Sequence, residues 1–342
     1  MTLHQIHLLI NWYVANARDL PWRRTRDPYH IWVSEIMCQQ TRVEAVKGYY
    51  ARFLQALPTI ETLAQADDEK LMKLWEGLGY YSRARNLKKA AQVVMQMHGG
   101  KLPNTVPGLL GLPGIGQYTA GAIASIAFDI PAPAVDGNVL RVFARLKADY
   151  DDITLDRTKK VFSAQLLQAI PHNQPGRFNQ ALMELGALVC LPNGVPLCSK
   201  CPLQDSCLAN KHNLINDLPV KTAKKPRRIE QKQLLILRYK DKLALRKRPK
   251  TGLLADLWEI PEAFEIAPQL IISDEPIGTA VHIFTHIEWH MAARKIFLRK
   301  KIGLEGVAWV TQQELEQSYA LPSAFAGFRD KMFSQESVDN LI

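Results

Sequence analysis

The sequence predicts a multidomain protein in which an all-α domain is followed by a smaller α+β domain. At 342 residues, the chain exceeds the length at which a single hydrophobic core usually stops growing. Apolar residues recur at intervals of three and four along the first part of the chain, as they do on one face of a helix. Beyond residue 231 they alternate, as they do in strands. We therefore expect a helical domain over residues 1 to 210, a linker over 211 to 230 and a mixed domain over 231 to 342.

Two local signals predict the first helices. Near the start of the chain, helical spacing relates the apolar residues Leu3, Ile6, Leu9, Ile10, Tyr13 and Val14. Further along, Asp27 can cap a helix whose first residue is Pro28. Proline is favourable at the first position of a helix, because the N–H that it lacks would have no hydrogen-bond partner there.

The C-terminal part carries two strand signals. Residues 233 to 239 read as one strand, and residues 280 to 292 alternate as a second. In that second strand, Val281, Ile283 and Thr285 face one side, whereas Phe284 and His286 face the other. The histidines at positions 282, 286 and 290 would then spread over roughly 26 Å, too far to share a metal ion.

Charge and hydropathy narrow the possible environments of the chain. The net charge is +10, and residues 221 to 250 hold thirteen Lys or Arg against two acidic residues. A polyanionic partner explains this concentration, but so does a solvated basic linker. No apolar run approaches the roughly 18 to 20 residues of a membrane span, and the N-terminus lacks a signal pattern. We expect an intracellular, soluble protein without a membrane partner.

Four of the five cysteines fall close together, at Cys190, Cys198, Cys201 and Cys207. An intracellular chain rarely forms disulfides from such a group, so metal ligation is the leading interpretation. Zinc sites usually show two closely spaced ligand pairs, whereas here single cysteines flank one C-x2-C pair at longer range. This spacing favours a 4Fe-4S cluster held by the 190 to 207 loop. A zinc site and plain thiols remain alternatives.

A glycine-rich turn precedes an apolar helix near the middle of the chain. Gly114 and Gly116 lie in the segment Leu112–Ala120, where glycine permits positive φ and close backbone approach. The N–H groups at the start of the next helix could bind a phosphate. An ordinary connection between two helices is the alternative.

Taken in series, these motifs resemble a known family across nearly the whole chain. The matching segments are Trp32–Thr41, Trp75–Arg85, the turn within about 109 to 127, Asp136–Asn138 and the four cysteines. The chain resembles the helix-hairpin-helix glycosylase superfamily and, within it, the MutY adenine DNA glycosylases. Its C-terminal part resembles a MutT-like (Nudix-like) domain at Gly252–Pro261 and Phe284–His286. The family's Arg-Glu-x-x-Glu-Glu stretch, which would bind Mg²⁺, is missing, so recognition is expected there instead of hydrolysis.

The resemblance implies a fold, a reaction and partners. The fold would be an all-α helix-hairpin-helix glycosylase domain with an iron-sulfur cluster loop, plus an α+β Nudix-like domain that recognises 8-oxoguanine. The enzyme would excise adenine mispaired with 8-oxoguanine or guanine in double-stranded DNA, as a monofunctional DNA-repair glycosylase holding one 4Fe-4S cluster. We expect a monomer in the bacterial cytoplasm, associated with the nucleoid.

The proposed chemistry needs two carboxyl groups with different tasks, because the leaving purine must be protonated while the sugar becomes cationic. Glu35 lies in an apolar helix, so burial should raise its pKa, and the resemblance makes it the proton donor to adenine N7. Asp136, beside a helix start, would stay ionised and stabilise the sugar cation, and Asn138 would position it or the attacking water. The ordinary alternatives are a half-exposed glutamate and a helix cap. Tyr118 stands where related lyases carry a Schiff-base lysine, which implies base removal without efficient strand cleavage.

The resemblance also assigns recognition residues, since a base within a duplex must be flipped out before it can react. Near the flipped adenine would lie Arg18, Trp22, Arg23 and Gln180. Beside the opposite base would lie Gln40, Leu78 and Tyr80, and the C-terminal domain would contribute Phe284, Thr285 and His286. If residues 280 to 292 form one strand, the last three cannot all reach the base; they can only do so from a loop.

Three other functions fit parts of the sequence. A catalytically silent damage sensor would keep the scaffold, but Glu35 and Asp136 are both present. An endonuclease III-like lyase acting on oxidised pyrimidines is disfavoured by Tyr118 and by the extra C-terminal domain. A zinc-stabilised transcription regulator would differ in the metal that its cysteines bind.

Overall fold

The computed structural model of the chain describes residues 1–223, 225–303 and 305–334. These divide into two compact units. The helical unit comprises Met1–Gln65 and Arg85–Ala223, and the sheet unit comprises Ala66–Ala84 together with the chain from residue 224 onward. Each unit is described by itself.

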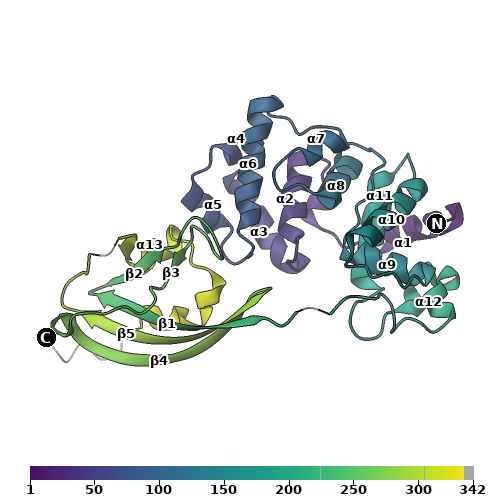
Figure 1. Ribbon diagram of the computed structural model, residues 1–342. Helices are drawn as coiled ribbons and strands as arrows, with labels where there is room; N and C mark the ends of the chain where they lie inside the picture. Colours follow the sequence, from purple (N-terminus) through teal and green to yellow (C-terminus); the bar gives the residue numbers. More distant parts are fainter. Residues whose placement is uncertain (224, 304, 335–342) are drawn as a thin grey trace. The chain divides into compact units, whose positions relative to one another are not determined.

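The helical unit consists of α-helices and short 3-10 turns (Figure 1). Its α-helices are α1 (Leu3–Asn16), α2 (Pro28–Cys38), α3 (Val43–Ala56), α4 (Ile60–Ala64), α6 (Ser82–Met97), α7 (Val106–Leu110), α8 (Gln117–Ala127), α9 (Gly137–Lys147), α10 (Asp156–Ala169), α11 (Pro175–Leu188) and α12 (Leu208–Lys211). Helix α6 begins within the sheet unit and continues into the helical unit. The 3-10 turns are η1 (Pro21–Arg23), η2 (Cys198–Lys200) and η3 (Gln204–Ser206).

The first two helix predictions are confirmed. Asp27 caps α2 by accepting hydrogen bonds from the backbone N–H groups of Tyr29 (2.8 Å) and His30 (3.2 Å). Helix α1 buries the middle of its apolar face, whereas Leu3 and Val14 at its two ends are exposed. Helical spacing gives the direction of a side chain, but not how far the neighbouring helices reach along α1.

Helix α11 packs between α1 and α9, and this contact brings three distant parts of the chain together. Two glycines permit the close approach of α11 to α9 and to α8. A Cβ at Gly186 would stand 2.5 Å from the Cβ of Asn138, and one at Gly176 would stand 2.7 Å from the carbonyl oxygen of Ser125. The core between these helices is apolar and includes Phe143, Phe162 and Phe178. Helix α11 is therefore held against the start of α9.

The sheet unit contains a six-stranded mixed sheet. Its strands are β1 (Arg228–Tyr239), β2 (Lys242–Lys247), β3 (Trp258–Glu259), β4 (Ile271–Ile283), β5 (Ile287–Leu298) and β6 (Val307–Val310), in the order β3-β2-β1-β5-β4 with β6 beside β2. β1 and β5 are parallel, and the other pairs are antiparallel. The helical segments are α5 (Asp68–Leu74), η4 (Pro268–Leu270), α13 (Gln312–Gln317), η5 (Ser323–Phe328) and α14 (Arg329–Met332). The predicted mixed α and β content and the strand at 233 to 239 are confirmed.

The segment Ala66–Ala84 is tied to the rest of the sheet unit by polar contacts. The Lys73 ammonium donates to the carbonyl oxygens of Leu315 (2.9 Å) and Tyr319 (3.2 Å). The Trp258 indole N–H donates to Glu69 Oε2 (2.9 Å). These contacts hold the segment that contains Leu78 and Tyr80 beside the sheet unit's α13 and β3.

The predicted single strand over residues 280 to 292 is wrong, because the chain reverses within it. β4 ends at Ile283 and β5 begins at Ile287, so residues 284 to 286 form the turn of a hairpin. The N–H of Phe284 donates to the carbonyl oxygen of Ile287 at 2.8 Å. Alternation with period two is the same in one long strand as in two strands joined by a tight turn, so the pattern could not separate them. The spread of roughly 26 Å between the histidines does not apply to a hairpin.

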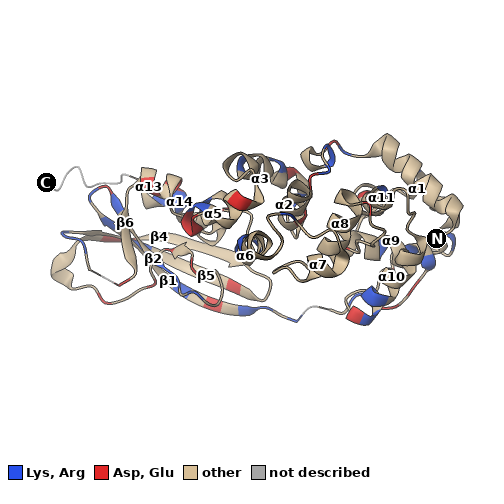
Figure 2. Ribbon diagram, turned by 90° about the horizontal axis from the view of Figure 1, so that it is seen from above, with Lys and Arg blue, Asp and Glu red and all other residues tan. Residues whose placement is uncertain are grey.

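Three further observations concern charge, metals and membranes. Lys and Arg recur along β1 and β2, as the blue segments of Figure 2 show. Across the described ranges, no three His, Cys, Asp or Glu side chains are grouped so that they could hold a single metal ion, and this includes the three histidines. Among the helices of the described residues, none is both long enough and apolar enough to cross a membrane.

Candidate active site

Glu35 and Tyr118 form the centre of the candidate site. Glu35 lies on the apolar helix α2, and Tyr118 lies in the first turn of α8. The Tyr118 hydroxyl donates a hydrogen bond to Glu35 Oε2 at 2.5 Å. Burial raises the pKa of Glu35 to about 7, although the bond from Tyr118 lowers it. The side chain as a whole is only half-buried by surface area, but protein atoms surround its carboxyl group closely. The carboxyl can therefore hold a proton near neutral pH, as the sequence predicted.

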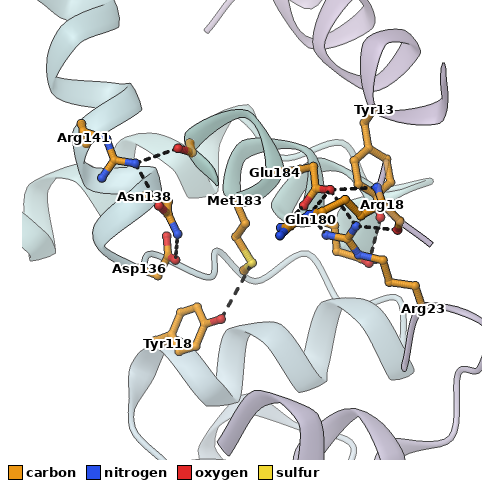
Figure 3. A network of polar contacts seen from close by, with 11 residues as sticks. Tyr13, Arg18, Arg23, Tyr118, Asp136, Asn138, Arg141, Gln180, Met183 and Glu184 are labelled. Carbon is orange, nitrogen blue, oxygen red and sulfur yellow. Dashed lines mark hydrogen bonds and ion pairs between the residues drawn. The ribbon is translucent and has the colours of Figure 1, made fainter. Parts of the chain in front are cut away.

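Tyr118 itself remains a proton donor. Burial, together with the charges of Glu35 and Asp136, raises its pKa well above the ordinary value. Its hydroxyl also approaches the sulfur of Met183 on α11 at 3.8 Å, a contact that Figure 3 shows. Tyr118 thus connects the carboxyl on α2 with helix α11.

Asp136 caps helix α9 and is held by two donors. Its Oδ1 accepts from the N–H of Val139 (2.8 Å), and its Oδ2 accepts from the Asn138 amide (2.7 Å). The pKa of Asp136 is raised overall, because burial raises it by more than these two hydrogen bonds lower it. The sequence predicted nearby N–H donors that favour the ionised form, with a helix cap as the alternative, but not that burial would outweigh them. Glu35 and Asp136 interact electrostatically, since the charge of Asp136 raises the pKa of Glu35.

Arg141 extends this arrangement away from the carboxylates (Figure 3). One of its terminal nitrogens, Nη2, donates to Asn138 Oδ1 (2.9 Å) and to the carbonyl oxygen of Gly186 (2.8 Å). Its Nε donates to the carbonyl oxygen of Cys190 (2.8 Å). Because Arg141 takes the oxygen of the Asn138 amide, the nitrogen of that amide is left facing Asp136.

The four clustered cysteines line one cavity of about 30 Å³, together with Arg145 and apolar side chains from α9 and α11. Arg145 donates to the Cys190 sulfur (3.3 Å) and to the carbonyl oxygen of Leu191 (2.9 Å). Burial raises the pKa of Cys201 to about 12 and also raises the pKa values of Cys198 and Cys207. The cysteines predicted from spacing are therefore brought together beside a buried cation.

Arg18 and Arg23, two of the residues predicted to bind adenine, both bind a buried carboxylate that the sequence analysis missed, and we call these three residues the arginine clamp. The carboxylate is that of Glu184 on α11, which is 1% exposed. Arg18 binds it in bidentate fashion, with Nε 2.9 Å from Oε1 and Nη2 2.8 Å from Oε2. Arg23 also binds it in bidentate fashion, with Nη1 3.0 Å from Oε1 and Nη2 2.7 Å from Oε2. Burial raises the pKa of Glu184, but the hydrogen bonds from Arg18 and Arg23 outweigh this and lower it to about 2.

The other two predicted pocket residues, Gln180 and Trp22, have different surroundings. Gln180 lies one helical turn before Glu184 on α11, and its Oε1 accepts a hydrogen bond from the Tyr13 hydroxyl at 3.0 Å. Trp22 is buried in η1 and packs edge-on against Tyr50, with ring centroids 5.2 Å apart. Gln180 thus lies beside Arg18, Arg23 and Glu184 (Figure 3), whereas one edge of the Trp22 ring is covered by Tyr50.

Of the two glycines in the turn, only Gly114 has the positive φ and the close backbone approach that the sequence predicts. Gly114 has φ +78°, and a Cβ there would stand 2.7 Å from the Cβ of Asn86. Gly116 has an extended conformation and caps α8 without a side-chain hydrogen bond. The first N–H groups of α8 therefore have no side-chain acceptor at the cap and can face an external anion.

The residues predicted to recognise the opposite base fall in both units. Gln40 belongs to the helical unit and has φ +58°. In the sheet unit, Tyr80 has φ +45°, is 47% exposed, and shares a 3.1 Å hydrogen bond with the Thr285 hydroxyl. Left-handed backbone at a bulky non-glycine residue is costly and is concentrated at functional sites.

The remaining recognition residues differ in exposure. Leu78 is buried. Phe284 packs its ring 4.9 Å from that of Trp289, whereas Thr285 and His286 are exposed in the turn. The condition that these residues belong to a loop is therefore met, and two of the three present their side chains to solvent.

Comparisons with known proteins identify the family of this chain. Residues 33–169 match the family model of the HhH-GPD superfamily of base excision DNA repair proteins, and residues 233–330 match that of the NUDIX domain. The adenine DNA glycosylase of Arabidopsis thaliana is 40% identical over 85% of this chain, which spans 56% of that relative. The enzyme of Rattus norvegicus is 34% identical over 91% of this chain and 74% of its own length. The chain belongs to the adenine DNA glycosylase family.

The solved structures most useful for comparison are other glycosylases. This adenine DNA glycosylase shares 30% identity and a TM-score of 0.56 with a thermostable thymine-DNA glycosylase, over 60% of this chain and 95% of that one. With endonuclease III in a trapped DNA complex it shares the fold, at 24% identity and a TM-score of 0.53, over 63% of this chain and all of the other. The family is one of N-glycosylase hydrolases in base excision repair, and its members include bacterial and eukaryotic enzymes.

Sequence reasoning missed the polar partners that orient the site of this adenine DNA glycosylase. Glu184, Arg141 and Arg145 are charged residues in otherwise apolar helices, and all three are 5% exposed or less. A charged residue on the apolar face of a helix must be paired when it is buried, and this was the signal available in the sequence.

Proposed function

We propose that this adenine DNA glycosylase hydrolyses the N-glycosidic bond of adenine mispaired with 8-oxoguanine or guanine in double-stranded DNA. One observation carries the proposal: Glu35, whose pKa burial raises to about 7, lies within electrostatic reach of a second carboxyl, Asp136, that two N–H donors hold. Two carboxyls in unlike environments can divide proton donation from cation stabilisation. In this proposal the glycosylase domain is residues 1 to 210, and residues 231 to 342, after the linker 211 to 230, recognise 8-oxoguanine.

Each residue then has a defined task. Glu35 gives its proton to adenine N7, so that the base leaves without negative charge. Asp136 stabilises the positive charge that develops on the sugar, while Asn138, held by Arg141, keeps the aspartate oriented. Tyr118 has no amine with which to form a Schiff base, which supports base removal without strand cleavage. Arg18, Arg23, Trp22 and Gln180 would form the adenine pocket.

The test is single-turnover base release from a duplex with one A opposite 8-oxoguanine, beside A·T and oxidised-pyrimidine duplexes. We expect adenine release from the mispair and strand breaks only after alkali. Tight binding without release would indicate a silent damage sensor. Spontaneous breaks at oxidised pyrimidines would instead place the chain among the lyases.

The pH dependence of release should report the proton on Glu35. We expect the rate to fall as the pH rises through about 7, because the acid form is lost above its pKa. Tyr118→Phe removes the hydrogen bond that lowers this pKa, so the decline should move up by about one pH unit. Single-turnover rates between about pH 5 and about pH 9 measure this.

The control for this shift is Tyr150→Phe, which alters an exposed tyrosine. Its pH profile should match that of the unaltered enzyme. An identical midpoint in the Tyr118→Phe variant would contradict the assignment of the profile to Glu35.

The same proposal includes one 4Fe-4S cluster bound by Cys190, Cys198, Cys201 and Cys207. The residues fit such a group, because all four side chains line one cavity and the Arg145 guanidinium lies 3.3 Å from the Cys190 sulfur. The alternative, a single zinc, is disfavoured by spacing, since zinc sites usually show two closely spaced ligand pairs. When bound, the cluster would supply structural cross-links between α11 and the 198 to 207 loop.

Replacing Cys201 by serine should remove the cluster. The purified enzyme should be brown and contain about four irons and four sulfides per chain, whereas Cys201→Ser should contain less than about one iron and unfold at a lower temperature. Elemental analysis and thermal unfolding measure both effects. Cys38→Ser, which alters the cysteine outside the cavity, should keep its iron. A colourless enzyme with one zinc would overturn the cluster.

Recognition of 8-oxoguanine is proposed to use Gln40, Leu78 and Tyr80, with Phe284, Thr285 and His286 of the hairpin turn, and Gly114 and Gly116 are proposed to bind the DNA backbone. The exposed Tyr80 ring and its bond to Thr285 support a shared surface within the sheet unit. The DNA partner is supported by a related structure described as a non-covalent endonuclease III–DNA complex. We further propose that the enzyme acts as a monomer on the nucleoid in a bacterial cytoplasm; a relative from Buchnera aphidicola is itself a bacterial protein.

Thr285→Val should weaken the preference for 8-oxoguanine over guanine by about tenfold, because it removes the hydroxyl that holds Tyr80. The ratio of single-turnover release rates from the two mispairs measures this preference. Thr279→Val makes the same change at an exposed position of β4 and should leave the ratio unaltered. An unchanged ratio in both variants would remove the turn from recognition.

A further inference from the structure

Tyr13 lies beside the proposed adenine pocket without having been assigned to it. It stands on α1 and is 8% exposed. Its hydroxyl donates a 3.0 Å hydrogen bond to Oε1 of Gln180, which lies 167 residues further along the chain. Figure 3 shows Tyr13 beside the arginine clamp formed by Arg18, Arg23 and Glu184. A buried hydroxyl that bonds to a single side chain can determine how that side chain is oriented.

The ring of Tyr13 makes a second contact in the same pocket. The guanidinium carbon of Arg23 lies 5.4 Å from the ring centroid, within the range of a cation–π contact. Arg23 is itself fixed by Glu184 and by the carbonyl oxygen of Arg18 (3.0 Å). The Tyr13 ring therefore packs against a guanidinium that three hydrogen bonds hold, while its hydroxyl reaches Gln180.

Gln180 is an amide, so its orientation determines which hydrogen bonds it offers. Its Oε1 accepts from Tyr13, and its Nε2 donates to the carbonyl oxygen of Gly176 at 3.3 Å. One further lone pair and one further N–H remain for a ligand. Rotating the amide by half a turn would place its oxygen against the carbonyl oxygen of Gly176, which can only accept. The Gly176 carbonyl therefore determines which end of the amide faces Tyr13, and the Tyr13 hydroxyl holds that end in place.

We propose that Tyr13 is a positioning residue that fixes the amide of Gln180 and thereby favours adenine over 6-oxopurines. Adenine offers an amino donor at C6, whereas hypoxanthine offers a carbonyl acceptor there. An amide held in one orientation pairs with only one of these patterns. The inference rests on the proposed function, in which Gln180 meets the edge of the flipped adenine.

The experiment compares single-turnover release of adenine and of hypoxanthine opposite 8-oxoguanine. Tyr13→Phe keeps the ring that contacts Arg23 and removes only the hydroxyl. We expect the ratio of adenine to hypoxanthine release to fall by about tenfold. A merely structural role would slow the release of both bases equally and leave the ratio unchanged, which would overturn the proposal.

The matched control is Tyr29→Phe. Its buried hydroxyl donates to the carbonyl oxygen of Leu57 at 2.7 Å, so the variant loses a comparable hydrogen bond elsewhere in the helical unit. Thermal unfolding should show similar losses of stability in the two variants, while only Tyr13→Phe should change the ratio. An equal change of the ratio in Tyr29→Phe would also overturn the proposal.

Gln180→Leu separates this inference from the proposed function. We expect the leucine variant to have a low ratio, and Tyr13→Phe to have no further effect in that background. A further fall in the double variant would show that Tyr13 acts through another group. If Gln180→Leu leaves the ratio unchanged, the proposed role of Gln180 is wrong, and the inference about Tyr13 fails with it. If Gln180→Leu lowers the ratio and Tyr13→Phe does not, only the inference about Tyr13 fails.

Discussion

Replacing Glu35 by glutamine is expected to slow adenine release by about 10²- to 10⁴-fold, the usual contribution of general acid catalysis. Burial holds the pKa of Glu35 at about 7, so a substantial fraction of the enzyme carries the catalytic proton at neutral pH. The amide of glutamine has no acidic proton to give. It keeps the volume of the carboxyl and can still accept the hydrogen bond from Tyr118. Binding of the A·8-oxoguanine duplex should therefore be retained.

Single-turnover release and equilibrium binding to the same duplex separate these two effects. Glu61→Gln is the control, because Glu61 is exposed on α4 and its variant should release adenine at the normal rate. Undiminished release by Glu35→Gln would remove Glu35 from the acid role. Loss of duplex binding together with release would mean that the residue maintains the pocket and does not act in the chemistry.

Features that depend on neighbours in sequence could be predicted without the structure. The cap at Asp27 needs only N–H groups two and three residues away. The cysteines fall within one short loop, and burial of Glu35 follows from the apolar helix around it. The family resemblance then selected these residues from among many ordinary glutamates and helix caps.

Features that depend on distant partners could not be predicted. Arg18 and Glu184 are 166 positions apart, and no local pattern pairs them. The contact depends on the packing of α11 against α1. Arg141 likewise reaches Cys190 and Gly186 only because α11 lies against the start of α9. A charged residue on the apolar face of a helix indicates that a charged or polar partner is needed, but it does not identify that partner.

The hairpin at residues 284 to 286 shows a different limit of prediction from the sequence. Side-chain alternation reports the period of the backbone and not its direction, so the reversal at residues 284 to 286 left the pattern intact. The turn matters for the site, because it exposes Thr285 and His286 in place of pointing them to opposite faces of a strand.

Replacing Glu184 by glutamine is expected to lower the free energy of unfolding by about 3 kcal/mol at pH 7. Glu184 is almost inaccessible to solvent and the two arginines are partly exposed, with side-chain exposures of 1%, 29% and 15% for Glu184, Arg18 and Arg23. A pKa lowered from 4.5 to about 2 corresponds to a stabilisation of about this size. A neutral glutamine would leave two guanidinium groups facing each other without the carboxylate between them.

The dependence of this loss on pH distinguishes an ion pair from simple packing. Because the pKa of Glu184 is lowered on folding, its contribution is present in full above about 4.5 and is lost as the pH falls toward about 2. Urea unfolding of both proteins should thus show the full difference at pH 7 and pH 5 and a much smaller one at pH 3. Asp19→Asn is the control, since its ion pair with Arg24 is exposed to solvent and should leave the free energy of unfolding almost unchanged at each pH. A difference that stays constant down to pH 3 would assign the role of Glu184 to shape and not to charge, and the arginines would then need another explanation for their fixed positions in the pocket.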